Sequence, residues 1–168
     1  MPGTPTKNQI LLARVVVGLI IAFLAAGAIT YGFSAEVRER FWHDLLERPD
    51  QIMRFRFVLQ PIMAAIAALH DGRVDARLGR SPYIWALVSS PSKRAVRLEE
   101  GAISTRRVLL LGLCMDTVYQ LIVLKTFYPA EAAAVAITLG FIPYLLLRGP
   151  ITRIARWRRG GPSANGGR

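Results

Sequence analysis

The sequence has few of the residues from which catalytic and metal sites are usually built. It contains one cysteine, two histidines and 11 acidic residues among 168. A single cysteine excludes a disulfide framework and any metal or iron–sulfur site made of several cysteines. The sequence also has no Ser/His/Asp set, phosphate-binding loop or dinucleotide fingerprint. It therefore predicts neither an enzyme nor a bound cofactor.

Long apolar blocks are what the sequence does contain. Hydrophobic residues make up 52%, which excludes a disordered chain, and the net charge is +11. Charged side chains fall between the blocks: residues 15–33, 108–124 and 129–147 carry almost none. About 20 apolar residues cross a hydrocarbon core of roughly 30 Å. The sequence therefore predicts an all-α membrane protein that forms a single membrane domain over residues 1–168.

The distribution of Lys and Arg predicts the topology. Residues 71–107 and the segment after Leu147 together carry 14 of them, whereas residues 34–50 carry three Arg against five acids. Positive loops stay in the cytoplasm. Residues 57–69 alone are short enough to re-enter the membrane, but the charge count favours a crossing. We expect four transmembrane helices, with both termini cytoplasmic, at about residues 12–33, 51–70, 107–126 and 129–147.

Three segments outside these spans have their own predictions. Residues 35–48 read as an amphipathic helix on the outer face, with Phe41, Trp42 and Leu45 on its apolar side. It is either a membrane-anchored connector or a docking surface. The cytoplasmic loop 71–106 and the tail 148–168, disordered from about residue 160, are basic. We expect both to attract anionic phospholipids rather than nucleic acid, because the positive-inside bias already explains their charge.

Asp116 is the main candidate for intramembrane chemistry, because it falls near the middle of the third span. A carboxylate there is costly unless it has a partner. Tyr119 and Gln120 share its helix face, and Gln60 lies at similar depth on the second span with Arg56 about a turn away. Pairing with Arg56, or a network with Gln60 and Tyr119, would satisfy it. The cluster is either a proton or cation site or a structural clamp between two spans. We expect no metal site, since His43 and His70 fall on opposite sides of the membrane.

Small residues recur every four positions along two of the spans. Gly18, Ala22 and Ala26 form such a stripe in the first span, and Ala132, Ala136 and Gly140 form one in the fourth. Small stripes let membrane helices approach closely. The stripes either pack within this chain or, in one case, face another subunit.

Residues 71–77 (DGRVDAR) share their Asp-Gly and Ala-Arg pairs with the membrane phosphatidyltransferases. Here an extra residue separates the two pairs, the preceding Asp is missing, and no Asp follows until Asp116. A two-metal phosphoryl site needs those carboxylates. We therefore exclude this activity.

Residues 116–157 resemble a group of small bacterial inner-membrane proteins. The resemblance lies in Asp116, Tyr119-Gln120, Phe127-Tyr128-Pro129, Pro143-Tyr144 and Arg148-Gly149-Pro150, and it covers about a quarter of the chain. It implies a bacterial inner-membrane setting and no activity. Two functions stay open: a non-enzymatic accessory or scaffold subunit of a membrane complex, or a small oligomeric transporter or ion-conducting protein that uses Asp116.

Overall fold

The computed structural model describes residues 5–32, 39, 42, 55–89 and 91–159, and every regular element in this part of the chain is a helix. The expectation of an all-α chain is confirmed for these residues. The elements are α1 (Lys7–Tyr31), α3 (Phe55–Arg77), α4 (Tyr83–Ser89), α5 (Pro91–Tyr119) with the π-helical turn η2 (Gln120–Leu124), α6 (Pro129–Ala136), the π-helical turn η3 (Ile137–Phe141) and α7 (Ile142–Arg159).

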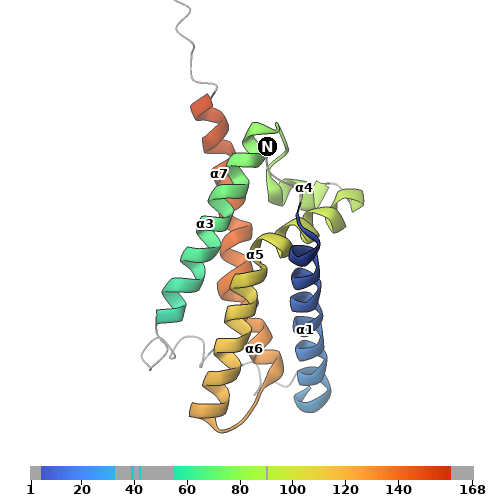
Figure 1. Ribbon diagram of the computed structural model, residues 1–168, viewed down its shortest axis with the longest axis vertical. Coiled ribbons are helices and arrows are strands. Elements are labelled where there is room, and N and C mark those ends of the chain that lie inside the picture. Colours follow the sequence, from blue (N-terminus) through green and yellow to red (C-terminus); the bar gives the residue numbers. More distant parts are fainter. Residues whose placement is uncertain (1–4, 33–38, 40–41, 43–54, 90, 160–168) are drawn as a thin grey trace, which may run out of the picture.

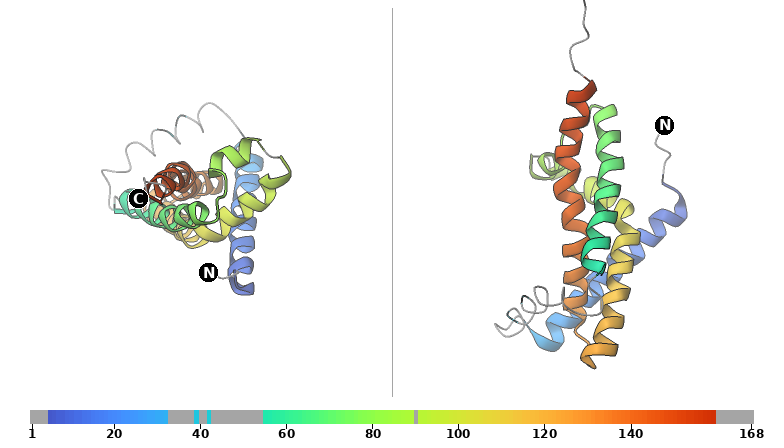
Figure 2. Two further views of the ribbon diagram at one scale, coloured as in Figure 1. Left: turned by 90° about the horizontal axis from the view of Figure 1, so that it is seen from above. Right: turned by 90° about the vertical axis from the view of Figure 1, so that its left-hand side faces the viewer.

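The helices form an up-and-down bundle, in which α1 and α5 run one way and α3 and α6–α7 run the other (Figure 1). The short loop between η2 and α6, residues 125–128, marks one end of the bundle, which we call the hairpin end. At the other end lie the starts of α1 and α5 and the finishes of α3 and α7; we call it the basic end. Within the bundle α3 lies along α7, and α1 crosses the other helices obliquely (Figure 2).

Three helical stretches are long and apolar enough to cross a membrane: Lys7–Tyr31, Arg94–Leu124 and Pro129–Arg158. Three of the four predicted spans are therefore helices that could cross a membrane. Helix α3 is not among them, since its apolar stretch 57–69 is followed directly by polar and charged residues. Residues 51–54 of the predicted second span lie outside the described residues. So does the predicted interfacial helix 35–48, apart from the helical residues Glu39 and Trp42.

Two segments predicted as a loop and a tail are largely helical. Helix α3 continues past His70 to Arg77, and α5 begins at Pro91, so most of residues 71–106 is regular structure. Helix α7 likewise continues past Leu147 to Arg159. The physical reason is that the end of α3 packs against α7, and Gly72 allows it: a Cβ there would lie 2.7 Å from Ile151. The segments keep their basic character and lie at the same end of the bundle.

The hydrophobic interior has two parts. One joins α1, α5 and α6 through buried Val16, Ile20, Leu109, Leu113, Ala132, Ala133 and Ala136. The other joins α3, α4 and α7 through Ala64, Ala68, Tyr83 and Tyr144. Helix α5 contributes to the first part and also contacts α3 and α4 of the second, so it connects the two halves of the bundle.

The two stripes of small residues have different environments. Ala132, Ala136 and Gly140 are all buried, and a Cβ on Gly140 would come within 3.2 Å of Val108. This stripe packs inside the chain, as membrane helices with small residues do. Gly18, Ala22 and Ala26 on α1 are all exposed, and a Cβ on Gly18 would meet nothing within 4 Å. The stripe on α1 is therefore not used within the described bundle.

Side chains of α1 contact the loop at the hairpin end. The Tyr31 hydroxyl donates to the carbonyl oxygen of Phe127 at 3.2 Å, and Phe23 meets the Phe127 ring edge-to-face with centroids 5.6 Å apart. Gly27, between them, brings α1 close to α6: a Cβ there would lie 2.2 Å from the Cβ of Ala130. The close approach of α1 and α6 requires a glycine at this point.

Two glycines of α1 provide a matched test of this packing. We expect Gly27→Ala to lower the free energy of unfolding by about 1–3 kcal/mol, because the added methyl overlaps Ala130. Gly18→Ala places the same methyl in open space and should stabilise the helix by up to about 1 kcal/mol. Thermal unfolding of the detergent-solubilised chain, followed by circular dichroism, measures both. Equal midpoints for the two variants would contradict the packing described here.

Candidate functional site

A network of charged and polar side chains joins four helices near the basic end. We call it the polar network. It comprises Asp71 and Asp75 from α3, Tyr83 from α4, Arg97, Glu100 and Ser104 from α5, Tyr144 and Arg148 from α7, and Arg80 from the α3–α4 connection.

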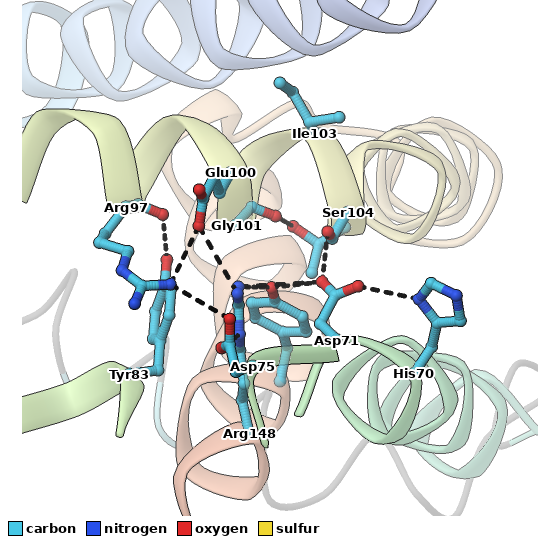
Figure 3. A network of polar contacts seen from close by, with 12 residues as sticks. His70, Asp71, Asp75, Tyr83, Arg97, Glu100, Gly101, Ile103, Ser104 and Arg148 are labelled. Carbon is cyan, nitrogen blue, oxygen red and sulfur yellow. Dashed lines mark hydrogen bonds and ion pairs between the residues drawn. The ribbon is translucent and has the colours of Figure 1, made fainter. Parts of the chain in front are cut away.

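Arg148 is the centre of this network (Figure 3). Its side chain is 3% exposed, and its Nε donates to Asp75 Oδ2 at 2.8 Å. One terminal nitrogen donates to the Tyr144 hydroxyl, and the other lies 3.6 Å from Glu100. The guanidinium therefore links α7 to both α3 and α5, with donors directed to all of these groups.

Asp71 connects the same three helices one turn away from Asp75. Its Oδ2 accepts from the hydroxyls of Ser104 and Tyr144, the latter at 2.8 Å. Its Oδ1 lies 3.1 Å from Nδ1 of His70, which is largely exposed. Asp71 and Asp75 are four positions apart on α3, so both carboxylates project from one face.

Two further arginines complete the charge balance. Arg97, on α5, lies 3.3 Å from Asp75 Oδ1 and 3.1 Å from Glu100. Arg80 pairs with Glu100 at 3.2 Å and lies 3.7 Å from Asp75. In the described network three carboxylates thus face three guanidinium groups, and the formal charges cancel.

Tyr83 closes the network where α4 meets α5. Its hydroxyl donates to the backbone carbonyl of Arg97, and its ring lies under the guanidinium of Arg148, 4.3 Å from ring centroid to Cζ. Gly101 makes this approach possible, since a Cβ there would lie 2.4 Å from the Tyr83 hydroxyl. The absence of a side chain at Gly101 thus allows α4 to pack directly on the backbone of α5.

The arrangement favours a structural role over acid–base chemistry. Desolvating charges is expensive, and good geometry with further hydrogen bonds is needed to offset it. Asp75 meets that condition with guanidinium nitrogens on both oxygens. Within the described residues, no group of three or more His, Cys, Asp or Glu side chains is arranged to hold a metal ion. The network clamps α3, α5 and α7 in one register.

The predicted intramembrane cluster lies nearer the hairpin end. Asp116 is fully buried, and the Gln120 side chain donates to its Oδ2 at 2.7 Å. The Gln120 oxygen in turn accepts from the backbone N–H of Tyr128 at 2.6 Å, which ties the carboxylate to the hairpin loop. Tyr119 is also buried. Asp116 lines none of the three grooves described below.

Gln60 does not join Asp116 in the described structure. Its side chain is 1% exposed, and neither of its amide atoms has a hydrogen-bond partner. It lies beside Gly112, one turn of α5 before Asp116. Of the other predicted site residues, the Arg56 side chain, Phe41 and Leu45 lie outside the described residues, and Trp42 is 54% exposed.

The polar network was not anticipated from the sequence, although one signal for it was present. Asp71 and Asp75 are two acids, four positions apart, in residues 71–80, where every other charged residue is an arginine. That pattern indicates buried partners, but the arginine that pairs with Asp75 is 73 positions away. The spacing of residues alone does not indicate which arginine of the sequence pairs with Asp75.

Comparison with family models, curated proteins and solved structures finds no match to this chain. The helical fold and three helices that could cross a membrane are typical of α-helical membrane proteins. The resemblance over residues 116–157 stays a prediction.

The carboxylate at the centre of the network should be far more important for stability than one on the surface. We expect Asp75→Asn to cost about 3–5 kcal/mol, because it removes the fully buried carboxylate that contacts both Arg148 and Arg97 and leaves three guanidinium groups facing two carboxylates. Glu99→Gln, the control, breaks an exposed 3.8 Å pair with Arg14 and should cost less than about 1 kcal/mol. Thermal unfolding in detergent compares them. Similar losses in both variants would contradict a clamping role.

Tyr83 should make stability depend on pH in the alkaline range. Burial raises the pKa of Tyr83 to about 12, from an ordinary value of 10.0. Because the folded state holds the neutral form, this contribution is complete below pH 10.0 and is lost as the pH rises towards 12. The tyrosinate absorbance of the wild type minus that of Tyr83→Phe should show one hydroxyl titrating near pH 12. A midpoint near 10 would contradict the burial.

Proposed function

We propose that this chain is a non-enzymatic accessory subunit of a bacterial inner-membrane complex, and that the outward face of α1 is its contact with other subunits. The observation that carries the proposal is the exposed small-residue stripe of α1, Gly18, Ala22 and Ala26. The equivalent stripe of Ala132, Ala136 and Gly140 is buried inside the bundle, whereas no described helix covers the stripe on α1.

The outward face of α1 is continuous along the whole helix. Leu11, Val15 and Ile29, which share the face with the stripe, are 62%, 49% and 86% exposed. Large side chains flanking small ones form ridges and a hollow that another helix can enter. In lipid, such close packing is a principal source of helix association. The face therefore suits a transmembrane helix of another protein.

A groove extends this face towards α5 at the basic end. It has a volume of about 430 Å³ and is lined mainly by apolar side chains of α1 and α5, among them Val17, Ile21, Leu98 and Ala102. The exposed Arg14–Glu99 pair stands at the same place. An apolar partner helix that lies on Gly18 would also fill this groove.

The proposed topology has four spans with both termini in the cytoplasm. Helix α3 runs opposite to α1 and α5, as a second crossing would (Figure 1). The end of α3, the first part of α5 and the end of α7 lie at one end of the bundle, and each of them carries several arginines. The positive-inside rule then supports assigning that end to the cytoplasm.

The contacts of the carboxylates support a non-enzymatic function. Those of the polar network face guanidinium groups, and Asp116 accepts from Gln120. The alternative is a small oligomeric transporter or ion-conducting protein that uses Asp116, and the full burial of this carboxylate favours it. The two functions differ in what α1 contacts: an unlike subunit, or another copy of this chain.

Photo-crosslinking in intact cells tests the proposal. A photoreactive phenylalanine at Ala22 should form an adduct with an unlike polypeptide, because Ala22 lies at the centre of the exposed face. The same group at Cys114, exposed on α5, is the matched control and should give no such adduct. Gly18→Leu should reduce the Ala22 adduct several-fold by filling the hollow. An adduct of twice the chain's mass would reject the accessory function in favour of the oligomeric alternative.

A further inference from the structure

We propose that the groove between α3 and α5 at the basic end binds one anionic diacyl phospholipid. Its phosphate would lie against Arg106 and Arg107, and its acyl chains would follow Met63 and Ile66. This site goes beyond the contact surface on α1 and does not depend on it.

The groove is the largest of the three that the structure describes, at about 670 Å³. Helices α3 and α5 form its walls, and the start of α1 contributes Pro5 and Gln9. One part of its lining is apolar, with Met63, Ile66 and Val108, and the other part is polar, with His70, Ser104 and the two arginines. A ligand that fills it must therefore have both an apolar and a polar region.

The boundary between apolar and polar residues falls within about one helical turn on the two walls, since Ser104 on α5 donates to Asp71 on α3. On α3 the apolar stretch ends at Leu69 and is followed by His70 and Asp71; on α5 it begins at Val108, directly after Arg107. A membrane phospholipid has the same arrangement, with an anionic group directly above its acyl chains. This match favours a lipid over a free anion, which would leave the apolar wall uncovered.

Two of the arginines that line the groove, Arg106 and Arg107, have no counter-charge among the described residues. The carboxylates that line the groove, those of Asp71, Asp75 and Glu100, are engaged by Arg80, Arg97 and Arg148 of the polar network. Arg106 and Arg107 have no ion pair there, and the buried Nε of Arg106 has no hydrogen-bond partner. Two guanidinium groups side by side at a membrane surface attract a phosphate, and Arg binds it with paired donors.

A second basic groove provides the matched control. It lies between α3 and α7, has a volume of about 400 Å³, and is lined by Arg73, Arg77 and Arg158. Arg73 and Arg77 are exposed and lie at the same end of the bundle as Arg106 and Arg107. Replacing either pair with Gln removes the same charge, so only the place of the change differs.

Native mass spectrometry of the full, delipidated chain in detergent measures the binding of phosphatidylglycerol. Removing two arginines at about 1 kcal/mol each should weaken binding about 30-fold in R106Q/R107Q. R73Q/R77Q should stay within about two-fold of the wild type. Ile66→Trp, a change at a residue 62% exposed, keeps every charge but fills the apolar half, and it should also weaken binding. This variant tests the site independently should the double variant fail to fold.

Comparison of different ligands distinguishes a phospholipid site from simple attraction to charge and from a site for a free phosphate. Phosphatidylcholine should bind much more weakly than phosphatidylglycerol, and glycerol 3-phosphate should not compete. Equal losses in the two arginine pairs would show attraction to charge alone and overturn the site. Competition by glycerol 3-phosphate, equal binding of both lipids or an unchanged Ile66→Trp would overturn the lipid assignment. None of these outcomes bears on the adduct expected at Ala22, so the two proposals fail separately.

Discussion

The buried ion pair between Arg148 and Asp75 is the interaction on which the rest of the structure depends. It joins the first half of α7 to the end of α3 at 2.8 Å, and through Arg97 and Glu100 it reaches α5. Apolar helices in lipid gain little from the hydrophobic effect when they associate, so their register must come from packing and polar contacts. Replacing the pair by apolar residues need not cost stability, but it would remove the feature that selects one register.

The clamp also determines the electrostatics of the basic end. Its carboxylates are matched by Arg80, Arg97 and Arg148, so the remaining arginines at this end have few acids to pair with. Arg106 and Arg107 on one side of α3, and Arg73 and Arg77 on the other, provide a positive charge that is not cancelled within the described residues. These four arginines therefore lie where a lipid surface would meet them.

The sequence predicts the apolar helices and local pairs well, because both depend on residues close together in the chain. The long helices α1, α5 and α6–α7 follow from hydropathy, and the Asp116–Gln120 contact follows from i, i+4 spacing. Two features could not be predicted in this way. The Asp75–Arg148 pair joins residues 73 positions apart, and the continuation of α3 to Arg77 depends on its packing against α7. Both depend on three-dimensional neighbours that the spacing of residues does not reveal.

The two small-residue stripes also show that residue spacing does not reveal three-dimensional neighbours. Their spacing is identical, yet the stripe on α6 lies against α5 and the one on α1 faces outward, because Gly27 and the hairpin loop fix which side of α1 meets the bundle. The outward face of α1 and the α3/α5 groove then lie on either side of α5, with Ile103 lining the grooves on both sides. Since the first half of α5 is held by the polar network, the two proposed sites are distinct, and a partner helix and a lipid can occupy them together.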